Sequence, residues 1–285
     1  MNVISIQSQV AYGHVGNSAA VFPMQMHGID VIAVPTTLLS NRPGYPTIRG
    51  RVLDAPLVAD LLLGIEERGA VDTAQMILSG YLGSPGIAAV VADFVARAKA
   101  RNPALRYCCD PVLGDRDRGL FVHADIPPLV CDRLCPIADV VTPNHFEFEY
   151  LSGAKVATTD QAIEAARALM TRGPSTVFVT SAELADTPAG EIETLAVERT
   201  QAFRVRTPKL PISPNGTGDL FAALLVSALV SGSDTSEALS HAASAIFAVL
   251  VRTATRATEE MRIVESAELL TNPRHRFDAI AINEP

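Results

Sequence analysis

Short apolar runs alternate with longer amphipathic stretches along most of the chain. The apolar runs predict buried strands at residues 3–6, 30–34, 76–78, 105–109, 140–141 and 176–180. The stretches between them have the length and the apolar faces of helices, at residues 17–27, 56–68, 86–101 and 161–171. Strands that alternate with helices predict right-handed crossovers and a parallel sheet that is covered by helices on both faces.

The pattern changes in the last third of the chain. Residues 191–205 alternate between apolar and polar side chains, which predicts an antiparallel hairpin. A long apolar helix is expected from Gly216, and residues 236–251 and 264–270 are expected to complete a helical end, with a polar loop at 253–258. Because no repeat and no long linker interrupts the pattern, we expect one α/β domain that spans residues 1–285.

The composition is that of a folded protein with a large core. Of the 285 residues, 48% are hydrophobic and 19% are charged, which excludes a disordered chain. No apolar run reaches the roughly 18 residues of a membrane-spanning helix, and residues 1–6 lack the basic start of a signal peptide, so we expect a cytoplasmic protein with no membrane partner. The net charge of −8 disfavours nucleic acid as a partner, because binding it needs a basic face.

The cysteines and two of the histidines have spacings that suggest structure rather than chemistry. Cys108, Cys109, Cys131 and Cys135 do not repeat the paired spacing of a zinc site, so we expect buried free thiols. His14 is expected to be structural. His145 follows a strand and a proline turn, and we expect it in an exposed loop.

The strongest chemical signal is Asn215-Gly216-Thr217-Gly218-Asp219, directly ahead of a hydrophobic helix. Two glycines at that place leave backbone N–H groups free at the positive end of the helix dipole, which makes a candidate anion site. Asp219, in the first helical turn, either caps the helix or serves as the general base for a hydroxyl group beside that site.

Acidic side chains follow two further predicted strands. Asp110 and Asp115 lie just past residues 105–109, and Glu147 follows residues 140–141 after a proline turn. Open α/β sheets bind their ligands at the carboxyl ends of the strands. Carboxylate oxygens that act together with nucleotide phosphates suit hydrated Mg²⁺ better than a transition metal.

These segments also carry a family resemblance, which spans almost the whole chain in order. The segments that match are Ile6-Gln7-Ser8-Gln9-Val10-Ala11-Tyr12-Gly13-His14-Val15-Gly16-Asn17-Ser18-Ala19-Ala20, Ser79-Gly80-Tyr81, Asp110-Pro111-Val112-Leu113-Gly114-Asp115, Thr142-Pro143-Asn144-x-Phe146-Glu147 and Gly216-Thr217-Gly218-Asp219. In them the chain resembles the pyridoxal kinases of the ribokinase superfamily. The resemblance implies a ribokinase-like three-layer sandwich, in which helices flank a mostly parallel central sheet.

The resemblance further implies ATP-dependent phosphorylation of the 5′-hydroxymethyl group of pyridoxal, and possible action on pyridoxine and pyridoxamine, in vitamin B6 salvage. It implies Mg²⁺, a monovalent cation (K⁺ or Na⁺) and a homodimer. By position it makes Asp219 the catalytic base and assigns the anion hole to the amides of Gly216, Thr217 and Gly218. It assigns ATP to Asp110, Thr142, Glu147, Thr180, Ser181, Thr217 and Gly218, the metal to Asp110, Asp115 and Glu147, and the substrate to Ser8, Thr37, Pro43, Tyr81 and Asp219.

One loop departs from the family pattern. The family's substrate-covering loop commonly reads Ser-Asn-His-Thr-Gly-Tyr, whereas residues 40–45 read Ser-Asn-Arg-Pro-Gly-Tyr. Pro43 offers neither a hydroxyl nor an N–H group to the pyridine ring, and losing that hydrogen bond costs about 0.5–1.5 kcal/mol. Arg42 becomes a candidate contact for an oxygen of the substrate or of a phosphate.

Two other functions fit the same residues. One is a kinase of a different hydroxymethyl heterocycle, such as hydroxymethylpyrimidine, which would differ in the ring pocket at Ser8, Thr37, Pro43 and Tyr81. The other is a pyridoxal-binding protein without catalysis. The intact run Gly216-Thr217-Gly218-Asp219 opposes that second alternative, because a binding protein has no need of a base.

Overall fold

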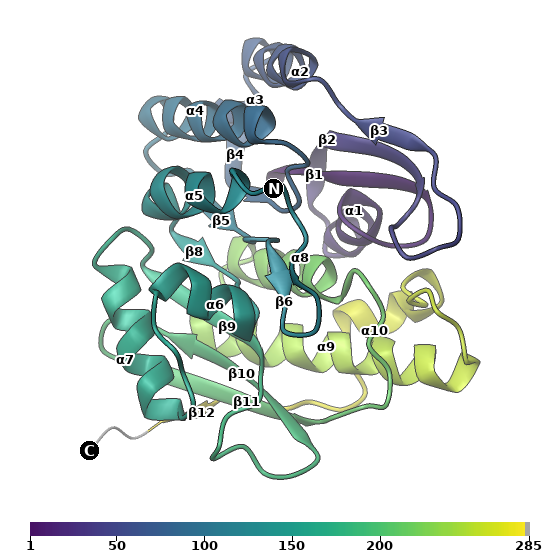
Figure 1. Cartoon of the computed structure of the whole chain (residues 1–285), viewed down its shortest axis with the longest axis vertical. Helices are drawn as coiled ribbons and strands as arrows, with labels where there is room; N and C mark the ends of the chain where they lie inside the picture. Colours follow the sequence, from purple (N-terminus) through teal and green to yellow (C-terminus); the bar gives the residue numbers. More distant parts are fainter. Residues whose placement is uncertain (283–285) are drawn as a thin grey trace.

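A ten-stranded sheet forms the frame of the molecule in the computed structural model, which describes residues 1–282 (Figure 1). Its spatial order is β12 (Ile280–Ala281), β11 (Ala202–Pro208), β10 (Glu191–Val197), β9 (Thr176–Ala182), β8 (Val140–Val141), β5 (Arg106–Cys109), β4 (Ala74–Ser79), β1 (Asn2–Tyr12), β2 (Asp30–Asn41) and β3 (Gly50–Val52). The run from β9 to β2 is parallel, and β3, β10, β11 and β12 add to it in antiparallel fashion. A separate small hairpin pairs β6 (Gly114–Asp115) with β7 (Gly119–Leu120).

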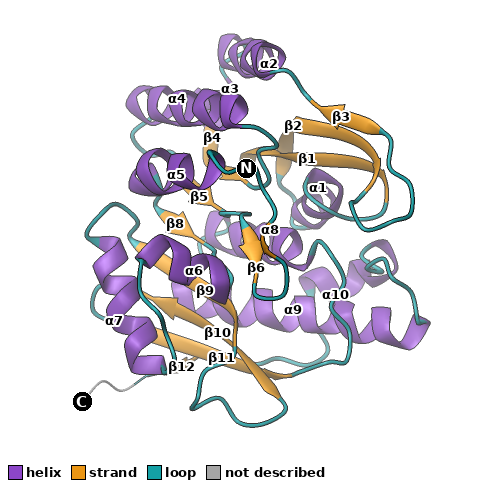
Figure 2. Ribbon diagram, in the orientation of Figure 1, coloured by secondary structure: helices purple, strands orange, loops and turns teal. Residues whose placement is uncertain are grey.

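The helices form a layer on each face of this sheet (Figure 2). One layer holds α1 (Asn17–Met26), α8 (Thr217–Val230), α9 (Thr235–Arg256) and α10 (Ala267–Thr271), with the 3₁₀ turn Val264–Ser266 beside them. The other holds α2 (Ala55–Glu67), α3 (Ala70–Thr73), α4 (Pro85–Arg101), α5 (Ile126–Leu129), α6 (His145–Ser152) and α7 (Thr159–Met170), with the π turn Val130–Leu134 and the 3₁₀ turn Cys135–Ile137. The expected α/β sandwich is confirmed.

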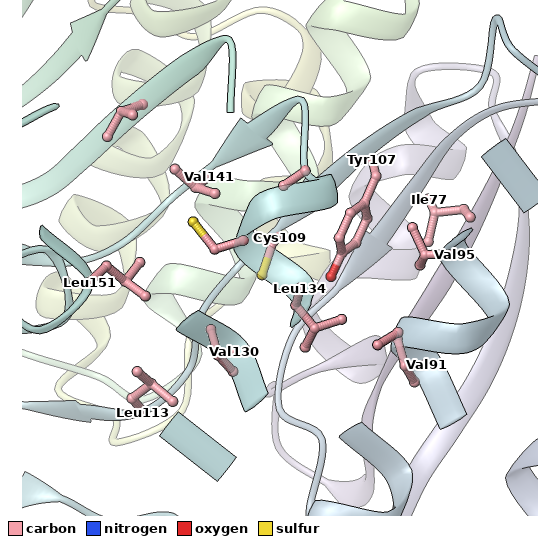
Figure 3. Close-up of a cluster of buried hydrophobic side chains, with 14 of the residues drawn as sticks. Ile77, Val91, Val95, Tyr107, Cys109, Leu113, Val130, Leu134, Val141 and Leu151 are labelled. Atoms are coloured by element: carbon pink, nitrogen blue, oxygen red, sulfur yellow. The ribbon is translucent and has the colours of Figure 1, made fainter. Parts of the chain in front are cut away.

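Alternation along the strands explains why two helix layers are needed. In β4, Ile77 points into the core shared with α4, whereas Met76 and Leu78 point into the core shared with α8. Figure 3 shows the first of these cores, where Ile77 and Tyr107 face side chains such as Val91 of α4. Because successive strand side chains point to opposite faces, a strand that is apolar throughout is stable only when both faces are covered.

The predicted strands and the hairpin are present, and β1 and β2 exceed their predicted lengths the most. β1 and β2 continue to Tyr12 and Asn41, past the apolar segments that predicted them. The hairpin formed by β10 and β11 pairs with β9 through β10. The expected sheet therefore has an additional overhang, made by the distal parts of β1 and β2 together with β3.

The polar loop expected at residues 253–258 is wrong, because α9 continues to Arg256. Thr253 is fully buried, and its hydroxyl donates to the carbonyl oxygen of Val249 at 2.8 Å. A threonine that satisfies its hydroxyl on the preceding turn remains inside a helix. The helix ends at Ala257, which has a φ of 50°.

One helix in the described part of the chain, α9, is long and apolar enough to cross a membrane when judged by length and composition alone. In the fold, 50% of its most apolar 18-residue window is buried, and the helix packs on α8, β10 and β11. Such burial is typical of a helix that packs in the core of a folded protein. The four cysteines are free thiols, of which Cys131 alone is partly exposed.

Candidate active site

The motif at residues 215–219 forms the beginning of α8. Gly216 occupies the N-cap position with a φ of 86°, a left-handed conformation that glycine adopts readily. A Cβ atom at this position would lie 2.0 Å from the carbonyl oxygen of His14, so the backbone approach excludes every side chain. The start of α8, with the unpaired amides of its first turn, therefore lies directly against the 13–16 turn.

Asp219 does not cap α8, which removes one of its two expected roles. Instead, its carboxylate lies near the backbone amide of Gly16, which acts to lower its pKa. Burial raises the pKa of Asp219, and the Gly16 amide opposes that shift in part. A partly desolvated carboxylate beside free helix amides is suited to accept a proton from a hydroxyl group.

Asp110 lies just past the end of β5, as the strand-end rule predicts. Its side chain is buried, and the Thr142 hydroxyl donates to Oδ1 at 3.0 Å. Burial raises the pKa of Asp110 well above its usual value, and the nearby charges of Glu147 and Asp219 raise it further. The structure thus brings together three acidic side chains that come from separate segments of the sequence.

Glu147 is held rigidly at the start of α6. Its Oε1 accepts the amides of Leu113 (2.9 Å) and Gly114 (3.3 Å), and its Oε2 accepts the amide of Asn144 (2.9 Å) in a capping box. Burial raises the pKa of Glu147 to about 7, although these amides lower it. The carboxylate therefore also fixes the chain that follows Asp110.

The expectation that His145 lies in an exposed loop is wrong. His145 is the first residue of α6 and is only 6% exposed. Its Nε2 lies 3.0 Å from the carbonyl oxygen of Val156 and its Nδ1 lies 3.2 Å from Arg116 Nη2, so the ring donates from Nε2 and accepts at Nδ1. Burial lowers the pKa of His145, which keeps this ring neutral.

Asp115 lies apart from Asp110, on the β6–β7 hairpin. Its carboxylate accepts the amide and the Nε of Arg118, both at 2.7 Å. Partial burial acts to raise the pKa of Asp115, but the hydrogen bonds and charge of Arg118 outweigh it and lower the pKa. The charge of Asp115 acts to raise the pKa of Glu147, and the Asp115 carboxylate is already paired with Arg118.

The donor set suits a hydrated Mg²⁺ ion bound together with phosphates. Among residues 1–282, no three His, Cys, Asp or Glu side chains gather as a metal-binding group. Asp110 and Glu147 provide carboxylate oxygens. Mg²⁺ is typically held by one or two carboxylates, with water and substrate phosphates completing its shell. The residues therefore fit Mg²⁺.

Thr180 and Ser181 lie at the end of β9, next to the start of α6. The Thr180 amide donates to the carbonyl oxygen of Pro143 at 2.9 Å, and Thr180 forms a β-bridge with Asn144. Ser181 is exposed and has a φ of 52°, a conformation that costs a non-glycine residue on the order of 1–3 kcal/mol. Such strain is typical of functional segments.

The expected ring pocket lies on the other side of Asp219. Ser8 lies opposite a β-bulge of β2, where two residues, Thr36 and Thr37, face one residue of β1, and a Cβ on Gly16 would lie 2.3 Å from the Ser8 Oγ. The hydroxyl of Thr37 is buried and has no partner within the described residues. Tyr81 is half-buried, and its carbonyl oxygen accepts from Thr36 at 2.6 Å.

Pro43 and Arg42 occupy the loop that follows β2. Pro43 is exposed, whereas the Arg42 side chain is buried and forms ion pairs with Glu260 and Glu259. Local sequence patterns do not connect Arg42 with Glu260, because the two residues are 218 positions apart. They also do not show that the His14 carbonyl lies against Gly216, although the glycines of the 13–16 turn signal a close backbone approach.

Comparison with known proteins places the chain in a family. A family model described as phosphomethylpyrimidine kinase matches residues 57–263. The chain is 46% identical to a pyridoxal kinase of Leifsonia xyli subsp. xyli, over 97% of this chain and 98% of that protein. It is 48% identical to a pyridoxal kinase of Rubrobacter xylanophilus, over 97% and 96%. The chain belongs to the pyridoxal kinase family.

The solved pyridoxal kinases share the whole fold. The pyridoxal kinase of Leishmania donovani, solved in complex with ADP and pyridoxamine, is 32% identical and superposes with a TM-score of 0.91, with 99% of each chain covered. The pyridoxal kinase architecture thus extends from β1 to the C-terminal strand of this chain, overhang included.

Proposed function

We propose that this chain transfers the γ-phosphoryl group of ATP to the 5′-hydroxymethyl group of pyridoxal, and of pyridoxine and pyridoxamine, in vitamin B6 salvage. The products are the vitamer 5′-phosphate and ADP. The observation that carries the proposal is the place of Asp219 in the first turn of α8, where the Gly216 N-cap lies directly against the 13–16 turn. Membership of the pyridoxal kinase family supports the choice of substrate.

Asp219 is the general base in this proposal. Its carboxylate accepts the proton of the substrate hydroxyl as that oxygen bonds to the γ-phosphorus, and ADP leaves from the opposite side. The amides of Gly216, Thr217 and Gly218 stabilise the charge on the transferring group. Thr142, Thr180 and Ser181 bind the remaining phosphates of ATP.

Asp110 and Glu147 would hold Mg²⁺, with Asp115 and a monovalent cation, K⁺ or Na⁺, nearby. When bound, the cations neutralise phosphate charge and orient the leaving group. The raised pKa of Asp110 supports this assignment, because crowded carboxylates favour the binding of a cation or a proton.

The ring pocket consists of Ser8, Thr37, Tyr81 and Pro43. The support for Thr37 is its buried hydroxyl, which has no partner within the described residues. Buried hydroxyls are normally hydrogen-bonded, so a polar substituent of the ring is its expected partner. Hydroxymethylpyrimidine is the competing substrate, because the matched family model is named for a phosphomethylpyrimidine kinase.

The test is ADP release from Mg·ATP, measured in parallel with pyridoxal and with hydroxymethylpyrimidine. We expect turnover of pyridoxal that falls by about 10²–10⁴-fold in Asp219→Asn, the usual contribution of a general base. Asp60→Asn, an exposed carboxylate of α2, is the matched control and should retain full activity. Turnover of the pyrimidine alone would reassign the substrate, and tight pyridoxal binding without turnover of either would leave a binding protein.

A cytoplasmic homodimer completes the proposal. The overhang exposes apolar side chains, with Tyr12 63%, Leu38 49% and Val52 38% exposed, and such a patch is typical of an interface between subunits. Sedimentation equilibrium decides between a dimer and a monomer of 30.2 kDa. Cell fractionation tests the compartment, and a membrane-bound fraction would contradict it.

A further inference from the structure

One carboxylate joins three loops at the edge of the active site. Glu260 lies in the segment that follows α9, and its side chain accepts hydrogen bonds from two other loops. Oε1 accepts Arg42 Nε at 2.9 Å and the Tyr45 hydroxyl at 2.7 Å. Oε2 accepts the backbone amide of His14 at 3.1 Å. The loop after β2, the turn after β1 and the segment after α9 are therefore tied to a single side chain.

The pair formed by Arg42 and Glu260 is largely removed from solvent. The two side chains are 9% and 14% exposed, and the Arg42 guanidinium lies 4.6 Å from the centroid of the Tyr45 ring. The hydrogen bond to Glu260 raises the pKa of Tyr45 to about 12, so this hydroxyl remains a donor. Removing one partner of such a pair leaves the other charge buried and uncompensated.

The contact with His14 connects this pair to the reacting groups. A Cβ on Gly13 would lie 2.4 Å from Glu260 Oε2, so the carboxylate rests directly on the 13–16 turn. At the other end of that turn the Gly16 amide is near enough to Asp219 to lower the pKa of its carboxyl group. Between them the carbonyl oxygen of His14 fills the space beside Gly216 at the start of α8.

We propose that Glu260 is a positioning residue of the active site. Its carboxylate holds the 42–49 loop closed against the 13–16 turn, and through the His14 carbonyl of that turn it positions the start of α8, which carries Asp219. The inference rests on the proposed kinase function, since it assigns a role to Asp219. It also accounts for the departure at residue 42: an arginine there serves Glu260 rather than the substrate.

Closure and base orientation are coupled by this arrangement. Opening the 42–49 loop breaks both hydrogen bonds to Oε1 and leaves Glu260 with the His14 amide alone. The turn is then held less firmly, and the start of α8, which carries Asp219, loses its fixed neighbour. The closed loop and the oriented base are thus formed together.

The neighbouring Glu259 provides a matched control. It also contacts Arg42, at 3.4 Å, but its side chain is 76% exposed. An exposed ion pair contributes little to stability or order. Glu259→Gln therefore removes the same charge from the same guanidinium without releasing the turn.

The experiment compares Glu260→Gln with Glu259→Gln in two assays. In steady-state kinetics, we expect Glu260→Gln to lower kcat and to raise the KM for pyridoxal by about tenfold each, the effect of losing a hydrogen bond to a charged group. The KM for ATP should change less. In limited trypsin digestion, cleavage after Arg49, in the 42–49 loop, should become faster. Glu259→Gln should match the wild type in both assays.

The two assays separate the possible failures. Unchanged cleavage after Arg49 in Glu260→Gln overturns the loop closure, and an unchanged kcat overturns the positioning of Asp219. A wild-type protein that does not phosphorylate pyridoxal refutes the proposed function instead, and the digestion still decides whether Glu260 holds the loop. If Glu260→Gln does not fold, Tyr45→Phe removes one hydrogen bond to Oε1 and keeps the ring beside Arg42, and it should show the same faster cleavage.

Discussion

The two sides of the active site handle charge in opposite ways. On the side that the proposed function assigns to phosphates, called the phosphate side below, Asp110 and Glu147 are both buried, and burial together with the charge of Glu147 raises the pKa of Asp110. On the side of the 42–49 loop, the Glu260 carboxylate is neutralised within the chain by Arg42. The first arrangement is complete only with a bound cation, whereas the second is complete in the folded protein alone.

The two sides therefore have different roles: the phosphate side is suited to bind a cation, and the side of the 42–49 loop is suited to position the chain. Carboxylates that repel each other store free energy that a cation releases on binding, so they favour the loaded enzyme. A neutralised and hydrogen-bonded pair has little to gain from a ligand, and it contributes order instead. Removing a carboxylate should therefore raise the metal-free melting temperature on the phosphate side and lower it on the side of the 42–49 loop.

The largest expected effect comes from Gly216→Ala, because Gly216 lies where the start of α8 contacts the 13–16 turn. The new Cβ would lie 2.0 Å from the His14 carbonyl oxygen, so the turn and the start of α8 must separate. We expect kcat to fall by about 10²–10³-fold, the usual cost of losing an anion-hole donor. Steady-state kinetics with Mg·ATP and pyridoxal measure it.

Gly232→Ala is the control for this variant. Gly232 follows the other end of α8 and has a φ of 95°, but no atom lies within 4 Å of its missing Cβ. An alanine at Gly232 would therefore have the same unfavourable positive φ as an alanine at Gly216, but it would not clash with a neighbouring atom. An equal loss of activity in both variants would show that strain in α8, rather than contact with the turn, is responsible.

A smaller effect with opposite signs is expected when each side loses a carboxylate. Asp110→Asn relieves the repulsion and should raise the metal-free melting temperature at pH 8, by about 2–4 °C for each kcal/mol gained. It should also raise the Mg²⁺ concentration for half-maximal activity by about tenfold or more. Glu260→Gln should lower the melting temperature. Differential scanning calorimetry measures both, and a shift of the same sign in the two variants would contradict the comparison.

The smallest effect is a pH dependence that arises from Glu147. Its folded pKa of about 7 lies above its usual value of 4.5, so the protonated form favours the fold. That stabilisation is fully present below pH 4.5 and is lost as the pH rises through about 7. Metal-free melting temperatures between pH 5 and 8 should fall less steeply in Glu147→Gln. Mg·ATP should flatten the wild-type profile, and identical slopes would exclude Glu147 as the cause.

The places of Asp110, Glu147 and Asp219 in the fold could be predicted from the sequence. Asp110 and Glu147 follow strands of a parallel sheet, so the topology alone brings them to one edge. Asp219 follows a glycine-rich helix start, which the chain marks locally. In each case the strand end or glycine-rich helix start lies within a few residues of the acidic side chain, and the sheet topology brings these segments to one edge.

The side of the 42–49 loop could not be predicted in the same way. The link between Arg42 and Glu260 spans 218 positions, and neither residue belongs to a local pattern. His145 was misjudged because burial at the start of a helix depends on tertiary neighbours such as Val156. The lengths of β1 and β2 were underestimated because their distal residues are partly exposed and are not uniformly apolar.

The bulge of β2 opposite Ser8 has a consequence for how this enzyme family can change. Before it, β1 is almost entirely buried and its side chains supply both cores, and beyond it the strand becomes exposed towards Tyr12. Substitutions before Ser8 would disturb the buried cores, whereas substitutions between Ser8 and Tyr12 affect the core less. New ring specificities are therefore most accessible through residues 8–12 and their partners on β2, where evolution or an engineer can alter the pocket and leave the interior intact.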